Sequence, residues 1–130
     1  MIGISCKTTN NFGGLERKAK QAGYRNLGHA AAMLRRFATQ SIRRSKRPAA
    51  VGSPPHTQTG RLRKAILFFN DRQRQEAIIG PSKNLIGLAG AEHEHGGKFR
   101  RERFEQRSYM GPALEKITPS LPPMWAGSIK

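Results

Sequence analysis

The chain has 130 residues and carries 24 Lys and Arg against 8 Asp and Glu, a formal net charge of +16. This length allows one domain with a modest core, and this charge favours polyanions or acidic protein faces as partners. Cys6 is the only cysteine, which excludes an intramolecular disulfide and CxxC metal or redox motifs and suits folding in a reducing cytoplasm.

The positive charge is concentrated in the first third of the chain. Met1–Arg47 holds eleven Lys and Arg and one acid, a net charge of +10, whereas Pro48–Lys98 and Phe99–Lys130 each have +3. The N-terminal segment has no apolar h-region, and no run of about 18 apolar residues occurs in the chain. We therefore expect neither a signal peptide nor a membrane span.

The basic first third predicts a long amphipathic helix after an arm of residues 1–14. Arginines fall largely off a stripe of apolar residues at helical spacing, which consists of Leu27, Ala30 or Ala31, Leu34, Phe37 or Ala38, and Ile42. We expect the helix to start near Leu15 and to kink or break near Gly23. Pro48 is expected to end it.

The stretch "GSPPHTQTGRLRKAIL", residues 52–67, predicts a stiff crossover from this helix into a strand. Pro54 and Pro55 favour extended backbone, and Gly60 tolerates a turn with positive φ. The strand is expected over "LRKAILFFN", residues 62–70. Because apolar residues fall on both of its faces, we expect it to be a central strand.

The rest of the chain predicts short elements. "EAIIGP" is expected to close an antiparallel hairpin, and residues 88–94 to form a helical turn that ends at Gly96. Residues 98–110 read as an exposed strand or a loop. Pro112 is expected at the first position of a short helix that Pro119 and the proline pair at 122–123 break.

This order of elements predicts an α+β fold, in which a long N-terminal amphipathic helix packs on a small antiparallel β-sheet and a short C-terminal helix follows. We expect a single domain over residues 15–118 and a C-terminal extension over residues 119–130. The core of such a domain is thin.

Catalytic and metal-binding signals are weak. The ligands of a metal cluster in "EHEH", residues 92–95, would lie on adjacent positions that neither a helix nor a strand brings to one point. Cys6 has no paired acid nearby in the sequence, so an inert thiol is favoured over a nucleophile. "GLAGAEHEHGG" lacks the strand-to-helix context of a dinucleotide fingerprint. We expect no enzyme, no metal and no cofactor.

Three short motifs, in this order and spacing, resemble the tail-completion or neck family of tailed bacteriophages. That family shows Thr-Gly-x-Leu-x-x-Ser-Ile after a proline-containing connector, then Glu-aromatic-Gly, then Arg-Pro-Phe-x-x-Pro-Ala-Leu. The matching residues here are Thr59, Gly60, Leu62, Ile66, Glu94, Gly96, Arg107, Tyr109, Pro112, Ala113 and Leu114. Ala65 stands where serine is commoner, His95 replaces the aromatic residue, and Ser108 replaces a proline.

The resemblance implies a structural virion protein without a catalytic site. Such a protein forms a ring, six-fold more often than twelve-fold, that joins the capsid connector to the tail tube and surrounds the DNA channel. Its partners are copies of itself, the neighbouring connector or head-closure protein, and the tail terminator or tail tube protein, with non-specific contact to genome DNA. It is made in the cytoplasm of the host bacterium and resides in the virion, at the neck.

The basic end of the predicted helix is expected to face a polyanion or an acidic partner through Arg35, Arg36, Arg43, Arg44, Lys46 and Arg47. The alternative is a solvated helix face. Trp125 is expected to dock on a partner, with a place in a core patch as the alternative. The rival function is that of a small basic nucleic-acid-binding protein of ribosomal or nucleoid type, because its net charge is typical of such chains.

Overall fold

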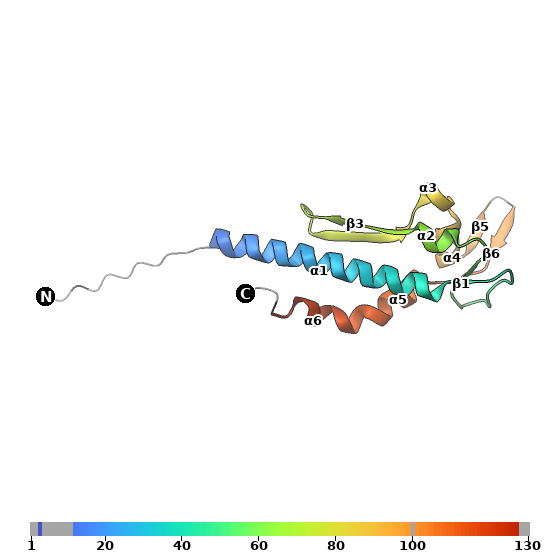
Figure 1. Cartoon of the computed structure of the whole chain (residues 1–130). Helices are drawn as coiled ribbons and strands as arrows, with labels where there is room; N and C mark the ends of the chain where they lie inside the picture. The colour runs from blue at the N-terminus through green and yellow to red at the C-terminus, as the bar shows by residue number, and fades with distance from the viewer. Residues whose placement is uncertain (1–2, 4–11, 100, 128–130) are drawn as a thin grey trace.

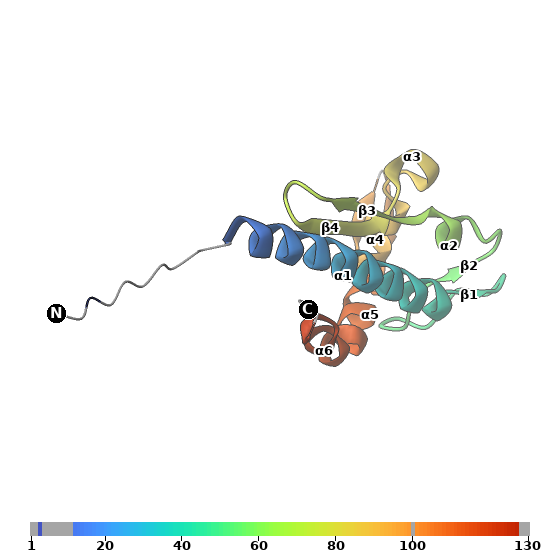
Figure 2. The ribbon, with the colours of Figure 1, turned by 60° about the vertical axis from the view of Figure 1, so that its left-hand side comes forward.

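The structure, a computed structural model, describes Gly3, residues 12–99 and residues 101–127. It is built around one long helix, α1 (Phe12–Ser41), which spans about 45 Å at 1.5 Å per residue. A β-hairpin lies along one side of α1, and the C-terminal helices lie along the other (Figure 1). Figure 2 shows the same three layers from a second direction.

The fold is α+β, with a long N-terminal helix and a short C-terminal helix, as predicted, but its described residues form three small sheets where one antiparallel sheet was expected. After α1 the elements are β1 (Arg43–Arg44), β2 (His56–Thr57), α2 (Arg61–Ala65), β3 (Ile66–Asp71), β4 (Glu76–Pro81), α3 (Lys83–Ile86), α4 (Ala89–His95), β5 (Gly97–Phe99), β6 (Glu102–Phe104), α5 (Met110–Ile117), the 3-10 helix η1 (Thr118–Ser120) and α6 (Leu121–Trp125). In the described ranges the strands pair as three two-stranded sheets, of which β1–β2 is parallel and the other two are antiparallel. Among the described residues, no helix is both long and apolar enough to cross a membrane.

The core lies where the second half of α1 meets α2, the start of β3 and α5. Its buried members are Leu34, Ala38, Ile42, Leu62, Ile66, Tyr109, Ala113 and Ile117. The predicted stripe is therefore confirmed at Leu34, Ala38 and Ile42, while Phe37 packs against the cluster half-buried. These few side chains make a small core, and α1 provides its longest wall.

The predicted break of α1 near Gly23 is wrong, because the helix runs without interruption from Phe12 to Ser41. A Cβ atom at Gly23 would lie 2.9 Å from Oε1 of Gln75, in the turn of the β3–β4 hairpin. This glycine thus allows the hairpin to approach the helix closely. The side-chain amide of Asn70 fixes the same contact by donating to the carbonyl of Tyr24, at 2.9 Å.

The helix ends at Ser41, seven residues before Pro48, which was the predicted end. The hydroxyls of Thr39 and Ser41 bond to carbonyls of the preceding turn, to Arg35 at 2.9 Å and to Ala38 at 2.7 Å. Such bonds compete with the helical backbone pattern. The chain then pairs as β1 with β2, so Arg43, Arg44 and the basic residues after them do not lie on the helix.

The predicted strand over residues 62–70 is wrong in its first part and is not central. Gly60, at φ 82°, starts the helix α2, and Leu62, Ala65 and Ile66 reach the core at helical spacing. The strand β3 begins only at Ile66 and, within the described part of the chain, pairs with β4 alone. Because no described segment covers its far face, Leu67 and Phe69 are exposed there.

The C-terminal half agrees with the predictions in its main elements. The hairpin strand β4, the helix α4 with its C-cap at Gly96, and α5 are confirmed, and the segment after Gly96 contains the strands β5 and β6. Pro112 is the third residue of α5 rather than the first. The proline pair at 122–123 lies in the first turn of α6 instead of breaking a helix, since the first turn tolerates proline.

The predicted arm of residues 1–14 falls mostly outside the described residues, and Cys6 lies outside them. Within that range the structure describes Gly3 and residues 12–14. Residues 12–14 form the start of α1, so the helix begins three residues before the predicted Leu15. The predicted C-terminal extension begins as η1 and α6, and α6 packs along α1.

Candidate functional site

A cavity lined mainly by cationic and hydroxyl side chains lies at the C-terminal end of α1. Its volume is about 400 Å³, and its lining comes from four parts of the chain. Arg35 and Thr39 belong to α1, Arg44 to β1, Thr59 and Gly60 to the turn before α2, and Arg63 and Lys64 to α2. This set is called the cationic cavity below.

Arg35 is held in place by the sheet. The amide of Ser82 donates a hydrogen bond to the carbonyl of Ala65. The next pair in the ladder, Ile66 and Pro81, is therefore one whose members do not bond to each other. As a result, the carbonyl of Ile66 points away from β4. Nε of Arg35 donates to that carbonyl at 2.6 Å. The bond satisfies an edge carbonyl and fixes the plane of the guanidinium.

Arg44 is held in a similar way. Its Nε donates to the carbonyl of Gln58 at 3.3 Å, across the short parallel pairing of β1 with β2. The next turn is ordered by Thr57, whose hydroxyl oxygen accepts from the amide of Gly60 at 3.1 Å, while Thr59 accepts from the amide of Arg61 at 3.4 Å. Because Thr59 uses only its oxygen there, its hydroxyl proton is available to a ligand.

The cations of the cavity have no acidic partner among the described residues. Residues 17–70 contain thirteen Lys and Arg and no Asp or Glu. Within the described part of the chain, the ion pairs join Lys20 to Glu16, and Arg74 to Asp71 and Glu76, none of which lines the cavity. Positive charges gathered without counter-charges raise the local potential and attract anions.

The structure brings together only part of the predicted basic face. Arg35 and Arg44 share the cationic cavity, whereas Arg36 lines a separate cavity of about 590 Å³ with Phe37 and Lys116. Lys46 and Arg47 line a third hollow, of about 210 Å³, beside His56, His93 and Arg107. Arg43 is exposed on β1.

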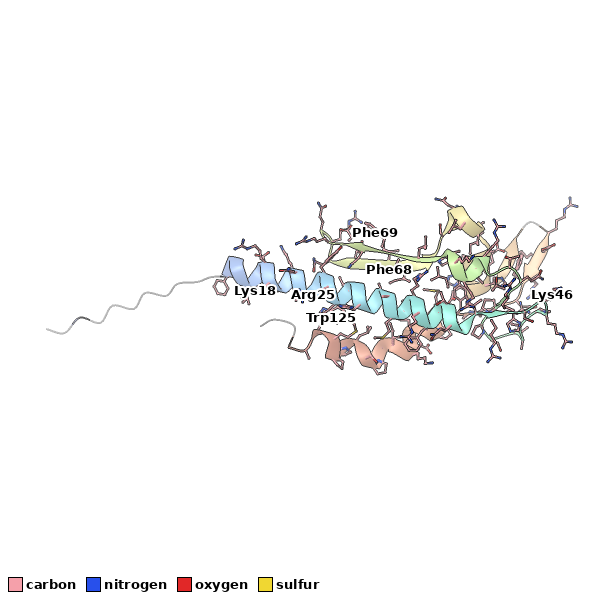
Figure 3. All side chains as sticks on the ribbon, viewed as in Figure 1. Lys18, Arg25, Lys46, Phe68, Phe69 and Trp125 are labelled. Atoms are coloured by element: carbon pink, nitrogen blue, oxygen red, sulfur yellow. The ribbon has the colours of Figure 1, made fainter. Side chains whose placement is uncertain are left out.

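Thr39, Arg63 and Lys64 are the members of the cavity that the sequence prediction missed, and the last two carry charge. Assigned to a strand, these two would have alternated between two faces; on α2 both are exposed beside Arg44. The signal was the helical spacing of Leu62, Ala65 and Ile66, which leaves the basic residues on the outer side. Figure 3 shows Lys46 at this end of the molecule and Lys18 at the far end of α1.

The second and third of the three short sequence motifs meet at the start of α5. The carboxylate of Glu94, in the last turn of α4, accepts hydrogen bonds from the amides of Tyr109, Met110 and Gly111, each at 2.9 Å. These amides would otherwise have no acceptor at the N-terminus of α5, and the helix dipole favours a negative charge there. One side chain thus joins two helices that are distant in sequence.

Tyr109 connects the same region to the core. It is fully buried, and its hydroxyl donates to the carbonyl of Gly90 at 3.0 Å. Burial and then the charge of Glu94 raise the pKa of Tyr109 far above its usual range, so the phenol stays neutral. Arg107, two residues earlier, donates through Nε to the carbonyl of Ala49 at 2.9 Å and ties the crossover to this site.

The remaining motif residues divide into structural and exposed positions. Leu62, Ile66 and Ala113 are in the core, and Gly96 ends α4 with φ 70°. Pro112 and Leu114 are exposed on α5. Trp125 is the last residue of α6 and keeps 37% of its surface exposed, while its helix packs along α1.

The outer face of the β3–β4 hairpin is apolar and uncovered by any described residue. Phe69 and Ile78 stand opposite each other in the register and are 64% and 61% exposed, and Leu67 lies on the same face. Figure 3 shows Phe69 on the side of the hairpin that faces away from α1. Apolar side chains clustered on one face in this way are typical of contact surfaces.

Within the described residues, no three His, Cys, Asp or Glu side chains come close enough to hold a metal ion. Comparisons of the chain with protein-family models, with curated proteins and with solved structures gave no match.

Proposed function

We propose that this protein is a structural subunit of the neck of a tailed bacteriophage particle. Copies of the chain form a ring that joins the capsid connector to the tail tube during head–tail assembly and surrounds the DNA channel. The observation that carries the proposal is the cap of Glu94 on α5. The cap joins the second and third motifs, and the first motif meets the third in the core, where Leu62 and Ile66 pack in one cluster with Tyr109 and Ala113. This interlocking of segments that are separate in sequence supports the interpretation of the three motifs as the signature of one fold.

The surface of the subunit suits assembly. The core is small, and the hairpin has one uncovered apolar face and two edges without partners among the described residues. A two-stranded sheet is marginal by itself and gains stability from further burial. In the ring, the face of Leu67, Phe69 and Ile78 contacts the next subunit, and Trp125 lies near the contact with a neighbouring connector or tail protein.

The test of the ring uses the full chain. Native mass spectrometry and electron-microscope class averages of the purified protein are expected to show a cyclic oligomer. In the phage particle, we expect the ring to have six-fold symmetry. Phe69→Asp is expected to give folded monomers, because a charge on the contact face is buried without a partner in the ring. The matched control, Gln73→Asp in the exposed hairpin turn, is expected to assemble normally.

The particle provides the decisive readout. Phages that lack the chain are expected to accumulate heads and tails that remain unjoined, and added protein to restore joining. A chain that stays monomeric at all concentrations and is absent from the neck in symmetry-averaged particle images contradicts the proposal.

The rival function, a small basic nucleic-acid-binding protein of ribosomal or nucleoid type, is supported by the cationic cavity. A stable monomer that binds random duplex DNA and never assembles favours this rival. Assembly into rings favours the neck protein whether or not DNA binds.

A further inference from the structure

We propose that the cationic cavity is a phosphate site, which takes phosphodiester groups of a nucleic-acid backbone without regard to base sequence. A phosphate site of this kind does not require a ring, so its test is separate from that of the neck function. Three properties of the groups around the cavity support the site: their orientation, their chemistry and their charge.

Two guanidiniums are oriented before any ligand arrives. Arg35 and Arg44 each use Nε on a backbone carbonyl, of Ile66 and Gln58 respectively. Their terminal amino groups have no carboxylate within 4.0 Å among the described residues. A guanidinium held in this way loses little freedom when it binds, and its paired N–H groups match two oxygens of one phosphate.

The other groups complete a set of donors. Arg63 and Lys64 add two exposed cations from α2, and the hydroxyl of Thr59 adds a neutral donor. No carboxylate of the described residues lines the cavity. The lining therefore offers hydrogen bonds and positive charge to an oxyanion.

A phosphodiester backbone fits the surroundings better than an acidic protein surface does. The exposed cations Arg43, Arg61 and Lys46 continue the charge beyond the cavity, and the chain that supplies this end has no acid over residues 17–70. Duplex DNA carries one negative charge per about 1.7 Å of its axis, without interruption. Protein surfaces carry positive as well as negative side chains, and the Lys and Arg of such a surface would repel these cations.

The experiment measures binding of the full chain to random-sequence duplex DNA by fluorescence anisotropy between 50 and 200 mM salt. The cavity variant combines Arg63→Gln with Lys64→Gln, and its matched control combines Arg17→Gln with Lys18→Gln, which removes the same charge at the far end of α1 (Figure 3). The cavity variant is expected to lower the slope of log K against log salt by about two, since each lost phosphate contact removes about 0.9. The control is expected to change it by less than half of that.

All four residues are exposed, and circular dichroism and thermal unfolding check that both variants fold. A second cavity variant, Arg63→Lys with Lys64→Arg, keeps both charges and is expected to retain binding. The proposal fails if wild-type protein does not bind DNA at 50 mM salt. It also fails if cavity variant and control lose the same affinity, because net charge alone then explains the binding.

Two competitors identify the source of the anion. Inorganic phosphate at matched ionic strength is expected not to displace the DNA; displacement by millimolar phosphate would make the cavity a site for free phosphate. Polyglutamate is expected to bind more weakly than DNA. Equal binding of polyglutamate with the same loss in the cavity variant would overturn the proposal in favour of an acidic protein partner.

Discussion

The junction of α4 and α5 depends on the carboxylate of Glu94, because this group accepts hydrogen bonds from three backbone amides. Glu94→Ala is expected to lower the free energy of unfolding by about 2–4 kcal/mol, because half-buried donors lose a charged acceptor. Glu94→Gln keeps one acceptor oxygen and is expected to lose less. Urea denaturation followed by circular dichroism measures both. The exposed control Glu105→Ala should stay within about 0.5 kcal/mol of wild type, and equal stabilities of Glu94→Ala and this control would refute the cap.

We expect His93 to make the stability of the same region depend on pH. Burial and then the charge of Arg107 lower the pKa of His93, and its Nδ1 is buried without a hydrogen-bond partner among the described residues. The unfolded chain takes up the proton near pH 6.5, which the folded protein resists. Stability is therefore full above about pH 6.5 and is lost as the pH falls through this value toward the lower pKa of the folded state.

Urea midpoints measured from pH 7.5 to pH 5 are expected to fall in wild type and to fall less in His93→Gln. His29→Gln, at an exposed position of α1, serves as the control and should retain the wild-type dependence. If His93→Gln and His29→Gln follow the same curve, the burial of His93 is not the cause.

At the scale of elements, α1 has one buried face that contributes to the core and one exposed face that does not. Leu34 keeps 8% of its surface exposed and sits in the core, whereas Arg36 is exposed. Leu34→Asp is expected to abolish soluble folding, at a cost of several kcal/mol for a buried unpaired charge. Arg36→Ala should leave the thermal midpoint nearly unchanged. Similar losses in both variants would mean that the buried side of α1 has been misassigned.

The elements that sequence predicted best are those with a long internal period. Helix α1 shows its stripe over several turns, so the spacing of apolar residues alone was enough to place Leu34, Ala38 and Ile42 on the buried side. Gly23 misled because its role depends on Gln75, fifty-two residues away, which local propensity does not contain. Helix α2 has only five residues, so the helical spacing of Leu62, Ala65 and Ile66 spans little more than one turn and was merged with the strand period of the residues that follow.

The candidate site was predictable only in part for the same reason. Arg35 and Arg44 were expected to act together, and they do share the cationic cavity. Arg63 and Lys64 join them because β2 pairs with β1 and α2 contacts β2, an arrangement that depends on tertiary structure. Glu94 could be matched to a motif, but its role as a cap requires α5 to begin within reach of α4.

At the scale of the whole molecule, the fold places several acidic side chains away from the cationic cavity. The acids at Glu16, Asp71 and Glu76 pair with basic residues, and Glu94 caps a helix. None of these acids lines the cationic cavity, so its four cations, Arg35, Arg44, Arg63 and Lys64, have no carboxylate beside them among the described residues. A partner with negative charge is favoured at this end, and the apolar hairpin face is left for contacts between subunits.

Reversing two charges at this end tests its role in the particle. Arg43→Glu with Arg44→Glu is expected to give folded protein, because both side chains are exposed on β1 and outside the core. The double variant should still fail to complete particles, and assembly of wild-type protein in vitro should weaken as salt rises, since exposed charges are screened.

The matched control, Arg17→Glu with Lys18→Glu, changes net charge by the same amount at the opposite end of α1 and separates position from total charge. It should support a yield of infectious particles well above that of Arg43→Glu with Arg44→Glu, called the β1 variant here. Retained assembly of rings by the β1 variant, with loss of DNA binding, would assign the defect to the nucleic acid; loss of docking with DNA binding intact would assign it to an acidic neighbour. Normal infectious yields from Arg43→Glu with Arg44→Glu would leave these arginines as solvated charges, since a surface needed for assembly does not tolerate a reversal of its sign.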